Sequence, residues 1–133
     1  MSVPRPYSCI LDASALLTLL HEEPGAGIVE PLLEEAVISS VNWSEVVQKS
    51  LARGVELDGL REDLEALGLV IAPFAVEDAE ASALLHRVAG GFGLSLADRA
   101  CLALSSKLAI PALTADRTWA ELEIEAVSVR LIR

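Results

Sequence analysis

Short apolar runs alternate with helical segments along the chain, and no other feature of the sequence constrains the fold as strongly. The runs are too short for helices but suit buried strands. Strands joined through helices pair in parallel through right-handed crossovers. We therefore predict an α/β fold, namely a three-layer α/β/α sandwich around a central parallel sheet of four to five short strands. The predicted strands are 7–11, 36–39, 69–72, 112–114 and 126–131.

Helical periodicity and turn residues place the helices between these strands. Pro24-Gly25 and Gly54 end two of them, because proline and glycine favour helix termini. The glycine-rich segment 90–93 lacks any phosphate-loop pattern and is predicted to be a connection. The predicted helices are 13–21, 27–35, 42–53, 57–67, 76–89, 95–108 and 117–122.

The length of 133 residues suits one domain, which we expect to span 1–133. Hydrophobic residues make up 53% of the chain, which excludes a disordered acidic tail. No apolar run reaches the length of a membrane span or has the form of a signal peptide, so we expect no membrane partner. Cys9 and Cys101 lie among aliphatic residues and are expected to be free, buried thiols, which fits a cytoplasmic location. His21 and His86 are too isolated for a zinc site.

Four acidic residues fall where parallel sheets place their functional crevice, which lies beyond the carboxyl ends of the strands. Asp12 ends the first strand, and Asp116 follows a later one. Glu45 and Asp98 lie in the first turns of helices. Three of the four have a structural explanation as well, since acids cap helix starts. Asp12, between Leu11 and Ala13, has no obvious structural role.

Clustered carboxylates repel one another, and a cation relieves that repulsion. Hard divalent cations prefer oxygen ligands, and Mg²⁺ takes a few carboxylates and keeps several waters. Such a site can activate water for attack on a phosphate. The residues therefore indicate metal-assisted phosphoester hydrolysis. The net charge of −10 excludes only a broadly basic nucleic-acid surface, since bound metal and a few local cations can hold RNA.

The segments around the four acids resemble PIN-domain ribonucleases, and most of all the VapC-type toxins of toxin–antitoxin pairs. The resemblance implies a Mg²⁺- or Mn²⁺-dependent endoribonuclease with a cognate antitoxin as partner, and commonly a homodimer. It also implies that Asp12, Glu45, Asp98 and Asp116 form the metal site. The segments that carry the resemblance are Leu11-Asp12-Ala13-Ser14-Ala15-Leu16-Leu17, Ser44-Glu45-Val46, Ser95-Leu96-Ala97-Asp98-Arg99-Ala100-Cys101-Leu102-Ala103-Leu104 and Thr114-Ala115-Asp116-Arg117-Thr118-Trp119.

We assign distinct roles to these acids as a hypothesis. Asp12 and Asp98 hold the metal, and Asp116 is a further direct or water-mediated ligand. Glu45 binds a second ion or orients the attacking water. Both one-metal and two-metal operation are compatible with the sequence.

Polar and basic neighbours of the acids are secondary candidates. Ser14 and Thr114 either hydrogen-bond a metal-binding carboxylate or cap a local turn. The candidate phosphate contacts are Lys49, Arg53, Arg99 and Arg117, each of which could equally be a plain surface residue. Trp43 and Trp119 either stack on bases or pack in the core or a dimer interface.

Three other functions also use acids of this kind. A phosphoacceptor signalling domain needs an acidic pair at its first strand, where Asp12 stands alone, and a lysine after a late strand, whereas Lys107 falls in a helix. A haloacid-dehalogenase-type phosphatase needs a second Asp at position 14, which is Ser. A degenerate PIN domain that only binds its partners remains an alternative.

Overall fold

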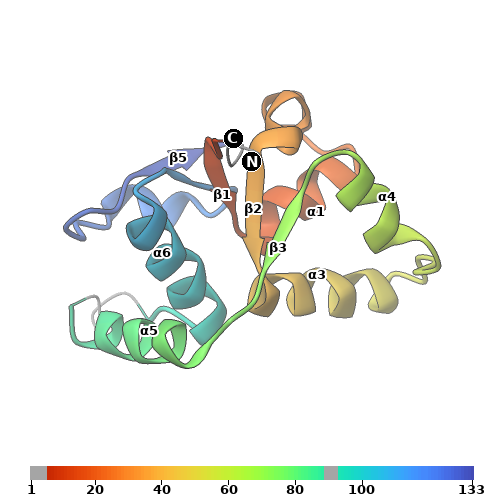
Figure 1. Cartoon of the computed structure of the whole chain (residues 1–133). Coiled ribbons are helices and arrows are strands. Elements are labelled where there is room, and N and C mark those ends of the chain that lie inside the picture. The colour runs from red at the N-terminus through yellow and green to blue at the C-terminus, as the bar shows by residue number, and fades with distance from the viewer. Residues whose placement is uncertain (1–5, 89–92) are drawn as a thin grey trace.

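Five parallel strands form the single sheet of the computed structural model, which describes residues 6–88 and 93–133 (Figure 1). The strands lie in the order β3-β2-β1-β4-β5, and every neighbouring pair is parallel. This confirms the predicted parallel sheet. The strands are β1 (Cys9–Leu11), β2 (Ala36–Ser39), β3 (Val70–Ala72), β4 (Ala112–Thr114) and β5 (Val129–Leu131).

Helices connect consecutive strands and cover both faces of the sheet (Figure 1). Within the described residues, none of them is long and apolar enough to cross a membrane. The α-helices are α1 (Ala13–Leu20), α2 (Ala26–Val29), α3 (Ser40–Ala52), α4 (Leu60–Ala66), α5 (Val76–Val88) and α6 (Leu96–Leu108). Two further segments are 3₁₀ helices, η1 (Glu30–Glu35) and η3 (Arg117–Glu121).

The alternation of side chains along the strands divides the core into two layers. In β1, Cys9 and Leu11 join a cluster with residues of α1 to α4, whereas Ile10 joins a second cluster with α6 and η3. Successive strand residues point to opposite faces, so one buried strand serves both layers. This confirms the predicted three-layer sandwich. Both cysteines are free and buried, as expected.

Several predicted boundaries shift for local reasons. The helix predicted at 27–35 is α2 followed by η1, because Pro31 has no N–H to continue an α-helical ladder. The helix predicted at 42–53 begins earlier, at Ser40, because the Ser39 side chain caps it. Leu60 rather than Leu57 begins α4, after Gly59 with a φ of +82°. The predicted end of α5 at Ala89 and most of the 90–93 connection lie outside the described residues.

The sheet has a topological switch point between the neighbouring strands β1 and β4. The first three strands proceed outward on one side of β1, and β4 then pairs on the other side of β1. Ligands of open parallel sheets bind at such a switch point, beyond the carboxyl ends of the two strands. The end of β1 is followed by Asp12, and β4 ends on Thr114.

Candidate active site

Asp12 is a buried carboxylate held by three hydrogen bonds at the end of β1. Its Oδ1 atom accepts from the backbone N–H of Ala15 at 2.8 Å and from the Ser14 hydroxyl at 2.7 Å. Its Oδ2 atom accepts from the Thr114 hydroxyl at 2.6 Å. Asp12 also caps α1, so the acid does have a structural role that its sequence position did not reveal. These bonds fix the orientation of the carboxylate.

Burial raises the pKa of Asp12 from its ordinary value of 3.8 to about 6. The hydrogen bonds from Thr114, Ser14 and Ala15 act in the opposite direction, and the negative charge of Asp98 adds to the rise. The charge of Asp98 therefore acts on the Asp12 carboxylate. Burial is also the main cause that raises the pKa of the Cys101 thiol, and the charges of Asp12 and Asp98 add to this rise.

This raised pKa makes the stability of the fold depend on pH. The folded state binds a proton on Asp12 more tightly than the unfolded chain does. Protonation of Asp12 therefore stabilises the fold, fully below about pH 4, and this stabilisation is lost as pH rises through about 6. The loss amounts to about 3 kcal/mol. Asp12→Asn removes the charge, so its free energy of unfolding should exceed that of the wild type above pH 7 in metal-free buffer and converge with it near pH 4. Urea unfolding across this pH range measures the difference, and equal pH profiles would contradict the assignment.

Asp98 lies in the first turn of α6 and completes a capping box with Ser95. Its Oδ2 atom accepts from the Ser95 N–H at 3.0 Å, and the Ser95 hydroxyl accepts from the Asp98 N–H at 3.1 Å. The structural explanation suggested by the sequence is thus correct. It does not exclude a second role, because Asp98 is only partly buried and its charge reaches Asp12.

Asn42 joins the helix of Glu45 to the helix of Asp98. The Asn42 side chain is 1% exposed, and its Nδ2 atom donates to the carbonyl oxygen of Ala97, which precedes Asp98. Its Oδ1 atom is buried without a partner in the part of the chain that the structure describes. Although the sequence places a helix start at position 42, Asn42 does not cap α3, because Ser39 does. Asn42 is instead an interior residue that ties α3 to α6.

Glu45 lies one turn beyond Asn42, at the surface of α3. Its side chain is 35% exposed, and Lys49 approaches its Oε2 atom at 3.9 Å. This contact confirms that Glu45 and Lys49 share a helix face.

Asp116 caps η3 and is exposed. Its Oδ1 atom accepts from the backbone N–H of Thr118 at 3.0 Å and from the Thr118 hydroxyl at 2.7 Å. The Asp116 N–H donates to the Thr114 hydroxyl at 3.0 Å, and that hydroxyl donates to Asp12. One hydroxyl group therefore links the backbone of Asp116 to the carboxylate of Asp12.

Ser14 and Thr114 form the centre of this polar network. The two hydroxyl oxygens lie 3.3 Å apart, and each donates to a different oxygen of Asp12. The Ser14 oxygen also accepts from the Ala115 N–H at 2.9 Å, which joins α1 to the end of β4. Both residues thus hydrogen-bond the Asp12 carboxylate, and Thr114 also caps a local turn through the Asp116 N–H. The backbone partner of Ser14 is distant in sequence, so the predicted local cap is wrong for this residue.

Asp12 and Asp116 follow β1 and β4, whereas Asp98 lies in the first turn of α6 and Glu45 just beyond the first turn of α3. Among residues 6–88 and 93–133, no three His, Cys, Asp or Glu side chains come together as a metal site would require. The donor chemistry nevertheless suits a hard cation, since the charge of Asp98 acts on the Asp12 carboxylate, and carboxylate oxygens are the ligands that Mg²⁺ prefers. The helix that carries Asp98 is tied by Asn42, whose buried amide oxygen has no donor among the described residues.

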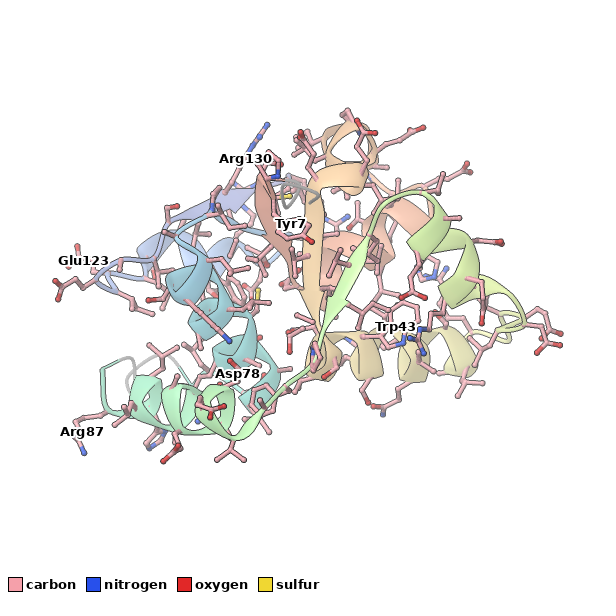
Figure 2. All side chains as sticks on the ribbon, viewed as in Figure 1. Tyr7, Trp43, Asp78, Arg87, Glu123 and Arg130 are labelled. Carbon is pink, nitrogen blue, oxygen red and sulfur yellow. The ribbon has the colours of Figure 1, made fainter. Side chains whose placement is uncertain are left out.

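The basic and aromatic candidates differ in their contacts and in their burial. Arg99 donates from Nη1 to the carbonyl oxygen of Ser82 at 3.0 Å and so ties α6 to α5. Arg117 is exposed on η3. Trp119 is 1% exposed in the second core cluster, so base stacking by this residue is excluded. Trp43 is partly buried against the first cluster, between α3 and α4 (Figure 2).

Comparison with known families matches residues 9–125 to the model of the PIN domain. This match covers most of the chain and all four acids. A comparison with curated protein sequences finds no match.

Solved structures share the fold at low sequence identity. A toxin–antitoxin complex from Klebsiella pneumoniae aligns with a TM-score of 0.70 and 23% identity, over 90% of this chain and 95% of the other. VapBC2 from Rickettsia felis, bound to a DNA fragment from its promoter, aligns with a TM-score of 0.68 and 14% identity, over 92% and 97%. DNA-bound VapBC from Salmonella typhimurium aligns with a TM-score of 0.68 and 13% identity, over 96% of this chain and 99% of the other.

Proposed function

The chain belongs to the PIN-domain family, and from that premise we propose that it is a Mg²⁺- or Mn²⁺-dependent endoribonuclease. The observation that carries the proposal is the buried Asp12 carboxylate, which three hydrogen bonds fix at the switch point and on which the charge of Asp98 acts. A structural cap needs no such burial, because exposed acids cap helices equally well. A fixed carboxylate pair is what metal-assisted phosphodiester hydrolysis requires.

Asp12 and Asp98 would hold the divalent cation, with Asp116 as a further direct or water-mediated ligand. Glu45 would bind a second ion or orient the attacking water. The cation, when bound, supplies charge neutralisation at the phosphate and a water of lowered pKa. Ser14 and Thr114 keep the Asp12 carboxylate from rotating, which preserves its position during the reaction.

In the reaction, the oxygen of a water molecule forms a bond to phosphorus, and the bond from phosphorus to a ribose oxygen breaks. The attacking water gives up a proton and the leaving oxygen takes one, so each cut yields one phosphate end and one hydroxyl end. The carboxylates of Asp12 and Asp98 have no catalytic proton to give in their charged state. They act by position and charge, which matches their fixed geometry.

We also propose that the chain is the toxin of a type II toxin–antitoxin pair, acts as a homodimer and is inhibited by a cognate antitoxin. The fold shared with the toxin–antitoxin complexes described above supports this proposal. Co-expression with the product of a small neighbouring reading frame tests it. Restored growth and a stable complex are expected, and growth that the chain alone does not impair would contradict a toxin role.

Incubation of the purified chain with total RNA tests the enzymatic proposal. Cleavage is expected with Mg²⁺ or Mn²⁺, and a chelator should abolish it, because the carboxylate pair alone provides no positive charge at the phosphate. Mapping of the cut ends checks the chemistry. A cyclic phosphate would indicate attack by the ribose hydroxyl rather than by water, and metal-independent cleavage would contradict the site.

The alternative to a nuclease is a PIN domain that binds its partners without cleaving RNA. A titration with Mn²⁺ followed by calorimetry should detect binding to the wild-type chain and weaker binding to Asp12→Asn. Metal binding without any RNA cleavage would favour a binding role.

A further inference from the structure

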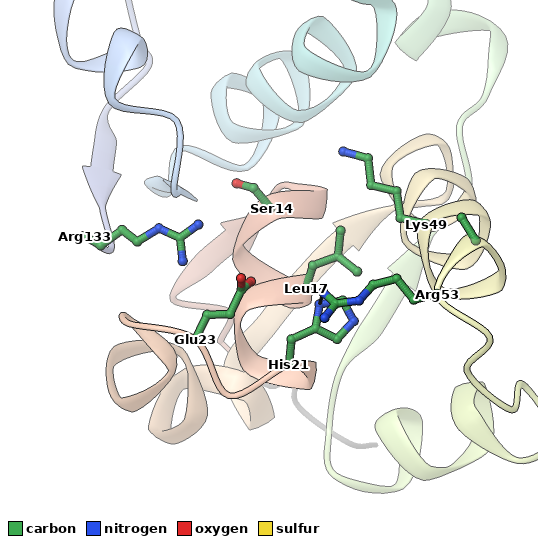
Figure 3. A pocket seen from close by; sticks show the side chains of 8 residues that line it. Ser14, Leu17, His21, Glu23, Lys49, Arg53 and Arg133 are labelled. Carbon is green, nitrogen blue, oxygen red and sulfur yellow. Dashed lines mark hydrogen bonds between the residues drawn. The ribbon is translucent and has the colours of Figure 1, made fainter.

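A groove begins beside the acidic site and runs between α1 and α3 (Figure 3). Its volume is about 390 Å³, within the range of pockets that hold a nucleotide-sized ligand. Ser14, which donates to Asp12, lies at one end of the groove. Arg133 approaches from the side opposite α3 (Figure 3). The charged and titratable residues that line the groove are His21, Glu23, Lys49, Arg53 and Arg133.

The groove is locally basic on an acidic protein. Three of its eight lining residues are Lys or Arg, whereas these types make up only 10 of the 133 residues of the chain. Glu23 has the one acidic side chain among the lining residues. A concave basic surface on a chain of net charge −10 attracts anions to this place rather than to the protein as a whole.

Two of the cations are held in place without being neutralised. Arg53 Nη1 lies 2.7 Å from His21 Nδ1, and because a guanidinium only donates, the imidazole nitrogen accepts. Arg133 Nη1 donates to the carbonyl oxygen of Pro24 at 3.1 Å and to the Thr18 hydroxyl at 3.3 Å. Among the described residues, neither guanidinium forms an ion pair with a carboxylate. Both charges are therefore ordered before any anion arrives, which lowers the entropic cost of binding one.

The close packing of the chain end fixes the position of Arg133. Gly25 has a φ of +108°, and a Cβ atom there would lie 2.6 Å from the carbonyl oxygen of Ile132. Only glycine lets the turn before α2 approach the residues after β5 so closely. This contact holds Arg133 against α1.

The groove is continuous with the acidic site. Ser14 lines the groove and also donates to Asp12, and Lys49 of the groove contacts Glu45. From Ser14 to His21, α1 extends about 10 Å. A strand whose phosphate lies at Asp12 would continue over Ser14 into the groove.

We propose that this groove binds the phosphodiester backbone of the single-stranded RNA that enters the acidic site. This inference rests on the proposed function. Arg53 and Arg133 contact phosphate oxygens, since the guanidinium fork matches phosphate geometry, and Lys49 adds a mobile charge. The continuity with Asp12 favours a nucleic-acid strand over an acidic protein segment, because the same strand would present the bond to be cut.

The salt dependence of RNA binding tests the proposal. Fluorescence anisotropy with a labelled single-stranded RNA of mixed sequence, in the presence of a chelator, measures affinity without cleavage. Arg53→Gln and Arg133→Gln should each weaken binding about threefold to tenfold at low salt. Each should also reduce the slope of log K against log[salt] by about 0.7, and the double variant by about 1.4. Arg133→Lys keeps the charge and should retain the wild-type slope.

Arg87→Gln is the matched control, since Arg87 is exposed on α5, away from the groove (Figure 2). It should change neither affinity nor slope. Circular dichroism confirms that each variant is folded. If Arg53→Gln and Arg133→Gln kept the wild-type slope, the proposal would be overturned. If they instead lost affinity for a poly-glutamate peptide alone, the groove would belong to an acidic protein segment.

Cleavage assays on the same variants separate this proposal from the proposed function. If the wild type cleaved RNA and the variants kept the wild-type salt slope, RNA binding by the groove would be contradicted and the nuclease proposal would stand. Weakened RNA binding in the variants without cleavage by the wild type would support the groove and contradict the nuclease. A wild-type chain that neither binds nor cleaves RNA would overturn both.

Discussion

Asp98→Asn is expected to lower the rate of RNA cleavage at least about a thousandfold at saturating Mg²⁺. The substitution keeps the shape of the side chain and removes the negative charge that acts on Asp12. A thousandfold loss corresponds to about 4 kcal/mol of transition-state stabilisation, a reasonable size for one metal-holding carboxylate in a preorganised site. Single-turnover cleavage of an RNA containing a mapped cut site measures it.

Asp78→Asn provides a control for the loss of the cap, because Asp78 also accepts a backbone N–H at the start of a helix, although its Oδ1 atom in addition accepts from Lys107 Nζ at 3.2 Å. Its Oδ2 atom accepts from the Ala75 N–H at 2.8 Å, as Asp98 accepts from Ser95. Both variants should lose a similar cap, worth about 1 kcal/mol. Only Asp98→Asn should lose activity. Equal activity in the two variants would reduce Asp98 to a capping residue and remove the carboxylate pair from the mechanism.

The positions of the acids could be predicted because each one depends only on the strand or helix next to it in the sequence. A strand end and a helix start each fix a residue near the carboxyl edge of a parallel sheet, so Asp12 and Asp98 could be placed at one edge without knowing the strand order. The alternation of apolar runs predicted the layers for the same reason. Both inferences use contacts that the chain makes close to each residue.

The sequence was uninformative where contacts join distant segments. Nothing near Asn42 shows that its side chain reaches the carbonyl oxygen of Ala97, 55 positions away. Arg133 contacts Thr18 across 115 positions. A polar residue within a helix reads locally as a surface residue or a cap, and only its complete burial, as for Asn42 and Thr18, reveals an interior role.

Trp119→Ala is expected to destabilise the fold by about 3–5 kcal/mol, a large part of the stability of a typical domain. Trp119 is the largest fully buried side chain and packs in the cluster that contains Ile10 and Leu102. Its loss leaves a cavity beneath η3, which is the helix that Asp116 caps. Urea unfolding followed by far-UV circular dichroism measures the change. Trp43→Ala is the control and should cost less, because Trp43 is only partly buried.

Trp119→Phe separates packing from RNA recognition at the same position. Phenylalanine retains an aromatic ring in the core and removes the indole N–H, which is buried without a partner among the described residues. Removal of an unsatisfied donor offsets part of the lost contact area, so Trp119→Phe should be clearly more stable than Trp119→Ala. RNA affinity of the folded variant should equal that of the wild type, since a ring with 1% exposure has no face for a base. A folded Trp119→Phe with weakened RNA binding would show that the η3 segment opens to present this ring, and the structural assignment of Trp119 would then be wrong.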